Sequence, residues 1–422
     1  MTVILRTLFL VFLIALSTAV RSQDDNTVFT LVRDASELKE GDEVIIAAPD
    51  VMVAMSKNTN SAKDAIYSAG VIICGDKIIA DRNVVQTFLL ESYSTKWIFS
   101  TGTLCLGCSE NKDKDLSFYD KKKNNYTGAT ITIGSDGQAE ININGVKIGY
   151  NTSFKLFTAT IGKICLYKRD ETISSVMVLD GSTQAANSSD VINVNFEKTV
   201  DFVALQRTFV GDGGWYTLCL PFALTADDIA TQFQGADFQE FTGVTMNADN
   251  TFNLEFRSVS QTRAGVPYLV RPIKDTEIIN PVFTDKLISE AKPVTVVHAL
   301  QTEPFSEYSF TGIYNSTDLF AVDSLANQTI RFVNADGTQL VRPINDGTKL
   351  KATRAYVKLP SADTKAMIRH HEGETDGIQH TMSDSQSRYA GVYDLGGRYV
   401  GPSAEGLERG VYIVDGRKIM MK

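Results

Sequence analysis

The chain has 422 residues, of which 43% are hydrophobic and 22% are charged. This length allows two or three domains with cores of their own, and the composition excludes wholesale disorder. The net charge of −9 argues against nucleic acid as a partner, because phosphate binding requires a basic surface.

The N-terminus predicts a secretory signal peptide over residues 1–22. Arg6 supplies a positive charge, and an unbroken apolar run extends from Leu8 to Leu16. Small residues follow, with Ser17, Ala19 and Ser22 as possible cut sites, and a cut after Ser22 gives the bounds above. The apolar run is shorter than the roughly 20 residues that span a bilayer. We therefore expect an exported protein with no transmembrane segment after signal removal.

Short apolar runs separated by turn residues predict an all-β domain over residues 24–170. Val28–Val32 is the first alternating strand and Ile164–Lys168 the last, and Gly134-Ser-Asp-Gly137 between two alternating runs predicts a hairpin. The pattern fits a β-barrel or a sandwich-like fold equally well.

The motifs FTLV, DASEL, GD and VIIA, a Trp-containing strand and a closing ICLYK resemble a β module of secreted proteins from Bacteroides and Prevotella relatives. The resemblance covers about 150 residues, an ordinary domain size. It implies export and a β fold, and it implies no activity. In that family a loop of small residues follows the Trp strand, whereas LCLGCSENKDKD stands here.

The cysteines are Cys74, Cys105, Cys108, Cys165 and Cys219, and their odd number leaves at least one unpaired within the chain. The C-x-x-C spacing of Cys105 and Cys108 is interpreted as a short disulfide or as two buried small side chains. A zinc site is disfavoured because no second pair of ligands follows, and a redox motif because the context is β. The pairing stays open. The other three lie in apolar strands, where a thiol acts as a small hydrophobe.

Residues 171–190 are rich in Ser, Asp and Asn and predict a linker, although Val176–Leu179 has the pattern of a strand.

Residues 191–360 predict an antiparallel β-sandwich with one short helix. In this region we expect one hairpin between Phe202–Phe209 and Trp215–Leu220. We expect a second hairpin between the runs Phe238–Met246 and Thr251–Val259.

The helix is predicted to begin after Thr225, which can accept a hydrogen bond as N-cap while Asp228 completes a capping box. Ile229 and Phe233 lie four residues apart and share one face, and Gly235 fits the C-terminal stop.

The segments GDGGWYTLCLPFAL, AGVPYLVRP and RAYVKLP resemble a second module of secreted and surface proteins from the same bacteria. This resemblance implies a surface module and supplies no catalytic residues. Trp97 and Trp215 lie among apolar residues and are interpreted as core side chains in preference to sugar-stacking platforms.

Residues 361–387 lose periodicity and predict a second linker. His370, His371, Glu372 and His380 fall in it and are interpreted as part of a solvated spacer, not as a metal site. His298 lies in a strand, where a packed or hydrogen-bonded histidine is expected. No nucleophile elbow, P-loop or zinc-protease motif occurs in the sequence, so no catalytic, cofactor-binding or metal-binding residue is assigned.

The tail Arg388–Lys422 predicts a small antiparallel sheet of about four strands, with Asp415-Gly416 as a type I′ turn. Its VYDLGGR, GVYIV and basic-apolar-Lys ending resemble the C-terminal sorting domain of type IX secretion. The alternative is a terminal hairpin that packs on the sandwich.

These features favour a secreted or cell-surface non-catalytic protein of the Bacteroidales type, adhesin-like or ligand-binding. The expected location is extracellular or on the outer-membrane surface. The expected partners are a glycan or protein ligand and, through Arg388–Lys422, the secretion machinery. The alternative is a secreted carbohydrate-active hydrolase or a glycan-binding accessory protein, so an enzymatic role is left open but not favoured.

Overall fold

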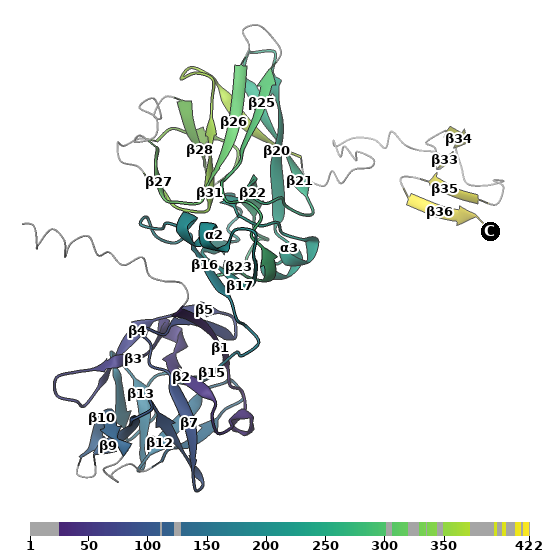
Figure 1. Ribbon diagram of the computed structural model, residues 1–422. Coiled ribbons are helices and arrows are strands. Elements are labelled where there is room, and N and C mark those ends of the chain that lie inside the picture. Colours follow the sequence, from purple (N-terminus) through teal and green to yellow (C-terminus); the bar gives the residue numbers. More distant parts are fainter. Residues whose placement is uncertain are drawn as a thin grey trace, which may run out of the picture. The chain divides into compact units, whose positions relative to one another are not determined.

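The computed structural model describes residues 25–109, 112–121, 128–300, 306–319, 329–334, 336–343 and 349–371, and the backbone of four short strands beyond residue 391. The chain forms two compact units, Met1–Thr375 and Asp376–Lys422. Strands predominate in both, as Figure 1 shows, and the predicted all-β class is confirmed. The predicted signal peptide lies outside the described residues.

The first part of the larger unit is one sheet of fifteen described strands. In chain order they are β1 (Asn26–Leu31), β2 (Glu43–Ala48), β3 (Val53–Thr59), β4 (Ile66–Gly70), β5 (Ile72–Cys74), β6 (Lys77–Asp81), β7 (Phe88–Tyr93), β8 (Lys96–Ser100), β9 (Leu104–Ser109), β10 (Lys112–Asp120), β11 (Thr130–Ile133), β12 (Ala139–Ile143), β13 (Val146–Tyr150), β14 (Phe154–Phe157) and β15 (Cys165–Arg169). The short 3-10 turns Ala35–Glu37 and Pro49–Val51 flank β2.

The hydrogen-bonded path through this sheet runs β10-β9-β8-β7-β2-β3-β4-β14-β13-β12-β11. Among the described strands this path does not form a closed barrel, although Ala129, directly before β11, pairs with Trp97 of β8. The predicted hairpin is confirmed, since β11 and β12 pair antiparallel around Gly137, whose φ of 78° suits glycine.

Strand β2 lies at the centre of this sheet and is buried on both faces. Val44 and Ile46 point into one apolar cluster and Ile45 and Ala47 into another. A strand covered on both faces has no reason to alternate, which accounts for the continuous run VIIAA.

The segment predicted as the first linker contributes strand β16 (Val176–Asp180). It pairs in parallel with β17 (Thr199–Gln206), which pairs antiparallel with β24 (Val282–Leu287). Val178 and Phe202 of this small sheet share an apolar cluster with Val28 of β1 and Cys74 of β5. The segment is therefore structured, and its apolar middle packs between neighbouring sheets.

Two five-stranded sheets make up the predicted sandwich. The first has the order β19 (Tyr216–Cys219), β22 (Pro267–Arg271), β20 (Asp237–Met246), β21 (Phe252–Val259), β32 (Ala366–His371). The second has the order β25 (Thr295–Leu300), β26 (Ser306–Ile313), β31 (Arg354–Lys358), β28 (Ile330–Val333), β29 (Leu340–Val341). Leu254 and Phe256 of the first sheet meet Phe310 and Val357 of the second in one apolar core.

The hairpin predicted between Phe202–Phe209 and Trp215–Leu220 is wrong. β18 (Thr208–Val210) pairs with β23 (Glu277–Ile279), and β19 pairs with β22. Phe209 and Ile278 face each other across β18 and β23, and both are buried in a second core. Burial of these distant apolar residues therefore decides the pairing, and closeness in sequence does not. The hairpin of β20 and β21 is confirmed.

The predicted helix is confirmed as α3 (Ala226–Gln232), with the capping box of Thr225 and Asp228 in place and Ile229 and Phe233 buried. A second helix, α2 (Ser189–Asn195), was not predicted. Its β-branched residues Val191 and Ile192 have weak helix propensity, and it forms because both are buried.

The segment predicted as the second linker is partly a strand. Ala366–His371 forms β32, which pairs in parallel with β21. Ile368 alone among its large apolar residues enters the core, so hydrophobic periodicity gives little sign of this strand. The structure also contains the two-stranded sheet of β27 (Thr317–Asp318) and β30 (Lys349–Leu350).

The smaller unit contains a four-stranded sheet with the order β34 (Tyr399–Gly401), β33 (Val392–Asp394), β35 (Gly410–Val414), β36 (Arg417–Met421). Both predicted strand pairs are present and antiparallel. The predicted turn residues between them lie outside the described part. Across the described residues of the whole chain, no helix combines the length and hydropathy that a membrane span requires.

Candidate functional site

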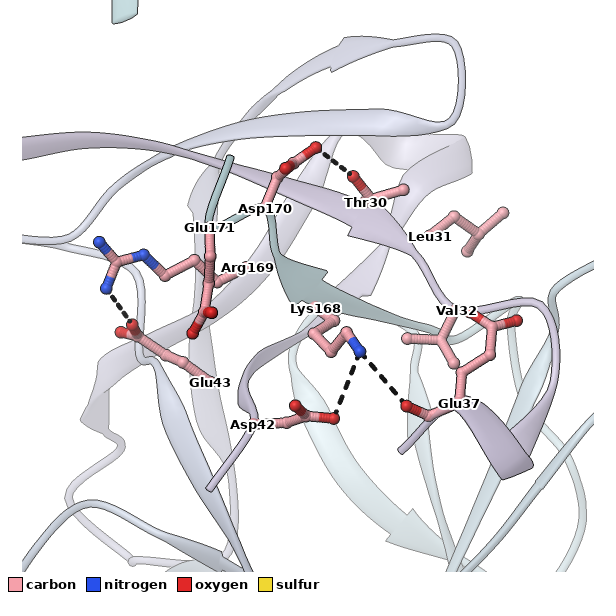
Figure 2. A pocket seen from close by; sticks show the side chains of 10 residues that line it. All are labelled: Thr30, Leu31, Val32, Glu37, Asp42, Glu43, Lys168, Arg169, Asp170 and Glu171. Atoms are coloured by element: carbon pink, nitrogen blue, oxygen red, sulfur yellow. Dashed lines mark hydrogen bonds and ion pairs between the residues drawn. The ribbon is translucent and has the colours of Figure 1, made fainter. Parts of the chain in front are cut away.

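An open pocket of about 320 Å³ lies in the first part of the larger unit, where three strand ends meet (Figure 2). β15 pairs antiparallel with both β1 and β2, which brings together residues more than a hundred positions apart in sequence. The lining residues are Thr30, Leu31, Val32, Glu37, Asp42, Glu43, Lys168, Arg169, Asp170 and Glu171. Most of them are charged.

Lysine and arginine side chains from the end of β15 hold two of the carboxylates. Lys168 Nζ lies 3.5 Å from Asp42 Oδ2 and also donates to the carbonyl oxygen of Glu37 at 3.3 Å. Arg169 Nη1 lies 3.1 Å from Glu43 Oε2. Glu43 is mostly buried and pairs with Arg82 as well. These pairs fix the positions of the polar atoms around the pocket.

Asp170 is held by donors from three residues. Its Oδ2 accepts from Lys77 Nζ at 2.5 Å and from Thr30 Oγ1 at 3.2 Å, and its Oδ1 accepts from Thr172 Oγ1 at 2.6 Å. Partial burial raises the pKa of Asp170, but the hydrogen bond from Lys77, those from Thr172 and the charge of Lys77 outweigh it and lower the pKa to about 2. Asp170 is therefore an ionised acceptor at any ordinary pH.

This arrangement is poorly suited to acid catalysis of glycoside cleavage. A general acid needs a pKa near the working pH, and that of Asp170 is shifted in the opposite direction. None of the ten lining residues is aromatic, so the pocket offers a sugar no ring on which to stack. What it offers is a set of fixed acceptors and two cationic groups.

The histidines and tryptophans considered from the sequence have packing partners. His298 Nε2 lies 3.2 Å from the carbonyl oxygen of Phe241, and its ring meets that of Phe241 edge-on at 4.7 Å, as expected for a packed histidine. Trp215 is buried in the sandwich core, as predicted. Trp97 is partly buried against the core of the first sheet, in keeping with the same prediction.

His370 and His371 are consecutive in β32, so their side chains point to opposite faces of the sheet. His370 lies 2.6 Å from Gln239 Oε1, whereas His371 Nε2 lies 2.5 Å from Glu255 Oε2. Glu372 and His380 lie outside the described residues. Within the described part of the chain, no group of three or more His, Cys, Asp or Glu side chains is arranged to hold a metal ion.

Four cysteines are free thiols buried in the structure: Cys74, Cys105, Cys165 and Cys219. Burial raises the pKa of Cys74 to about 12 and that of Cys165 to about 11, and it raises those of Cys105 and Cys219 as well. These thiols therefore act as small apolar side chains, as the sequence suggests. The side chain of Cys108 lies outside the described part.

The pocket itself was not predicted from the sequence. Its residues come from positions near 30, 42 and 169, and no motif spacing links them. The one local signal was the charged run Lys168-Arg-Asp-Glu171 directly after an apolar strand, which is also the ordinary composition of a solvated turn.

Comparison with known proteins gives no family. No family model matches the chain, and no curated protein matches it. Among solved structures, the chain is similar to a mosquitocidal holotoxin with a TM-score of 0.28 and 10% sequence identity. The match covers 76% of this chain and 52% of the toxin chain, so this chain spans about half of that protein's length.

Proposed function

We propose that the chain is a non-catalytic ligand-binding protein of the adhesion type, secreted or attached to the cell surface, and that the pocket beside β15 contacts its ligand. The observation that carries this proposal is the fixed set of charged groups in an open pocket. Ion pairs hold the carboxylates of Asp42 and Glu43 in place before any ligand arrives, which lowers the entropy lost on binding.

The pocket chemistry favours a ligand rich in hydrogen-bond donors. Asp170 and Glu43 present ionised or ion-paired oxygens, and Glu171 is exposed at the rim. The hydroxyl groups of a glycan or the amide and ammonium groups of a protein match such acceptors. A carbohydrate-active hydrolase or a glycan-binding accessory protein is the alternative outcome of the test below.

The test uses the chain without residues 1–22 on a glycan array and against immobilised surface proteins. Glu171→Ala and Arg169→Ala change exposed lining residues and should weaken binding at least tenfold with folding intact. Glu307→Ala, an exposed residue of β26 far along the chain, is the matched control and should bind normally. Binding that all three variants leave unchanged excludes the pocket, and turnover of any polymer excludes the non-catalytic function.

We further propose that the smaller unit is a delivery signal for a type IX secretion system in a bacterium of the Bacteroidales group. In support, Asp376–Lys422 is compact by itself and contains its own four-stranded sheet. Deleting Arg388–Lys422 in a host with that system should leave the protein in the periplasm. Surface delivery that is unchanged by the deletion rules this function out.

A further inference from the structure

The imidazole of His370 lies between two oxygen atoms. Its Nδ1 is 2.6 Å from Gln239 Oε1, and its Nε2 is 2.9 Å from the backbone carbonyl oxygen of Gly337. A carbonyl oxygen only accepts hydrogen bonds. Both ring nitrogens can donate at the same time only when both carry hydrogen, which is the imidazolium form.

The orientation of the Gln239 amide is set by its other neighbours. Gln239 is fully buried, and its Nε2 donates to Asp237 Oδ2 at 2.9 Å. The other oxygen of Asp237 accepts from Ser258 Oγ at 2.7 Å. A flipped amide would bring its oxygen against the Asp237 carboxylate. The NH₂ group therefore faces Asp237, and Oε1 faces His370.

An aromatic ring also covers the imidazole. Trp215, itself buried, stacks on His370 with a centroid distance of 4.1 Å and an angle of 12° between the planes. The face of an indole attracts a cation, most strongly where water is excluded. This contact stabilises the imidazolium over the neutral ring.

The charged groups around His370 are of both signs. Asp237 on β20 lies behind the Gln239 amide and favours a positive ring, and the exposed Asp336 precedes Gly337 in the neighbouring turn. Arg271 on β22 lies 4.9 Å from the Trp215 ring and disfavours it, but its guanidinium is also 3.8 Å from Asp237.

Further side chains near His370 come from β32 itself and from β21. On β32 itself, Arg369 is exposed, and His371 faces Glu255 of β21 on the opposite side of the sheet. Across the strand pair, the residue of β21 in register with His370 is the apolar Phe256. The two oxygens that contact the ring nitrogens of His370 are acceptors, and they favour the charged form.

We propose that His370 is a proton-operated latch that holds β32 on the edge of its sheet. The imidazolium ties the strand to β20 through Gln239 and to the 334–339 turn through Gly337. When the ring loses its proton, one of the two oxygens faces a nitrogen lone pair and that hydrogen bond is lost. Because the folded state prefers the protonated ring, docking of β32 is strongest in acid and weakens as the pH rises past the range in which His370 titrates.

Release of β32 has a structural consequence. The strand pairs along its length with β21, and Ile368 fills the core between the two sheets. An edge strand is among the first elements to open in a native protein. A rise in pH would therefore free β32 from the sandwich. This inference is independent of the proposed ligand pocket.

The direct test is ¹⁵N NMR of the four histidine rings in the full chain, with each ring assigned through its own substitution. At pH 7, where a free histidine is mostly neutral, His370 should carry hydrogen on both ring nitrogens. Gln239→Met removes one acceptor, so the His370 ring should lose its second hydrogen at a lower pH than in the unchanged protein. A His370 ring with one bare nitrogen at pH 7 overturns the proposal.

The second test measures hydrogen exchange of the β32 amides, corrected for the intrinsic effect of pH. One released proton can change the opening equilibrium by at most about tenfold per pH unit. We expect opening of β32 to increase about tenfold between pH 6 and pH 8.5 in the unchanged protein, and to be nearly flat in His370→Gln.

His298→Gln, in another strand, is the control and should keep the full pH dependence. If His370→Gln shows the same pH dependence as the unchanged protein, another group causes the effect and the proposal is overturned. The ring-nitrogen measurement does not require a folded His370 variant. Substitution of each of the other three histidines assigns their signals, and the signal that is left belongs to His370.

Discussion

The guanidinium of Arg207 donates to the carbonyl oxygen of Thr353 at 3.1 Å, and Thr353 has a φ of 57°, a value that β-branched residues rarely adopt. The same Nη1 donates to Thr217 at 2.8 Å, and the guanidinium lies 4.5 Å from the centre of the Phe209 ring. Burial and nearby Arg354 lower the pKa of Arg207 well below its usual value. This buried contact joins β19 to the turn before β31.

Arg207→Met should destabilise the fold strongly. The substitution keeps most of the volume but removes a buried donor from the carbonyl oxygens of Thr217 and Thr353, and the second still accepts from Cys219 N at 3.3 Å. An unsatisfied buried polar group costs about 1–3 kcal/mol. We expect the free energy of unfolding in urea to fall by about 2–4 kcal/mol. Arg263→Met, whose side chain is 70% exposed, should change it by less than about 0.5 kcal/mol. Equal effects of the two substitutions would exclude this role for Arg207.

Two substitutions at Thr353 should separate backbone strain from side-chain contacts. Gly and Ala both remove the hydroxyl that donates to Ala352, but only Gly accepts a φ of 57° without strain. The left-handed conformation destabilises the folded Ala variant by about 1–2 kcal/mol. The more flexible unfolded chain of the Gly variant lowers the stability of that variant by about 0.4–1 kcal/mol. Thr353→Gly should therefore be about 0.5–1 kcal/mol more stable than Thr353→Ala by urea unfolding. The reverse order would contradict strain at this position.

Gly211→Ala should be poorly tolerated. A Cβ at this position would overlap the carbonyl oxygen of Ile273 and lie 2.9 Å from the backbone nitrogen of Thr276. Both neighbours are backbone atoms and cannot rotate away, so we expect a loss of about 1–3 kcal/mol in urea unfolding. Gly70→Ala is the matched control, because nothing lies within 4 Å of a Cβ built there. If the two variants are equally stable, the backbone around Gly211 leaves more room for a Cβ than these distances indicate.

The fold should lose the stabilising contribution of Asp170 in acid. Its pKa is lowered to about 2 in the folded protein, so its contribution is fully present above about pH 4 and is lost as the pH falls toward 2. The advantage of the unchanged protein over Asp170→Asn in the urea midpoint should therefore shrink as the pH falls from about 4 to 2. A constant difference over that range would show that Lys77 and Thr172 do not hold the carboxylate as charged.

The four buried thiols should resist alkylation. The thiolate is the reactive form, and burial raises the pKa of Cys74 to about 12 and that of Cys165 to about 11. Native protein treated with iodoacetamide at pH 8 should gain at most one label by mass spectrometry, at Cys108, and should react at every free thiol in urea. Rapid labelling of Cys105 or Cys219 in the native protein would contradict their burial.

Local patterns in the sequence were sufficient for several elements. Thr225 and Asp228 predicted the start of α3 because a capping box satisfies backbone donors within four residues. The turns at Gly134–Gly137 and Asn247–Asn250 predicted their hairpins because each flanking strand pairs with its sequence neighbour. Export remains a prediction from the signal-peptide pattern of the N-terminus. The sorting role of the tail and the bacterial origin remain predictions because they depend on resemblance and not on the described contacts.

Which strands pair when they lie far apart in the sequence could be decided only by the tertiary structure. Phe209 packs against Ile278 and not across the nearby turn, because burial of both side chains in one core outweighs the advantage of a short connection. β32 has little apolar signal, and its place is set by parallel pairing with β21 together with the contacts of His370 to Gln239 and Gly337. The pocket likewise arises where β1, β2 and β15 end together. The sequence by itself determined the strand-rich class, the capped helix and the local hairpins, because their contacts are short-range. Tertiary packing decided which strands pair and which charges meet.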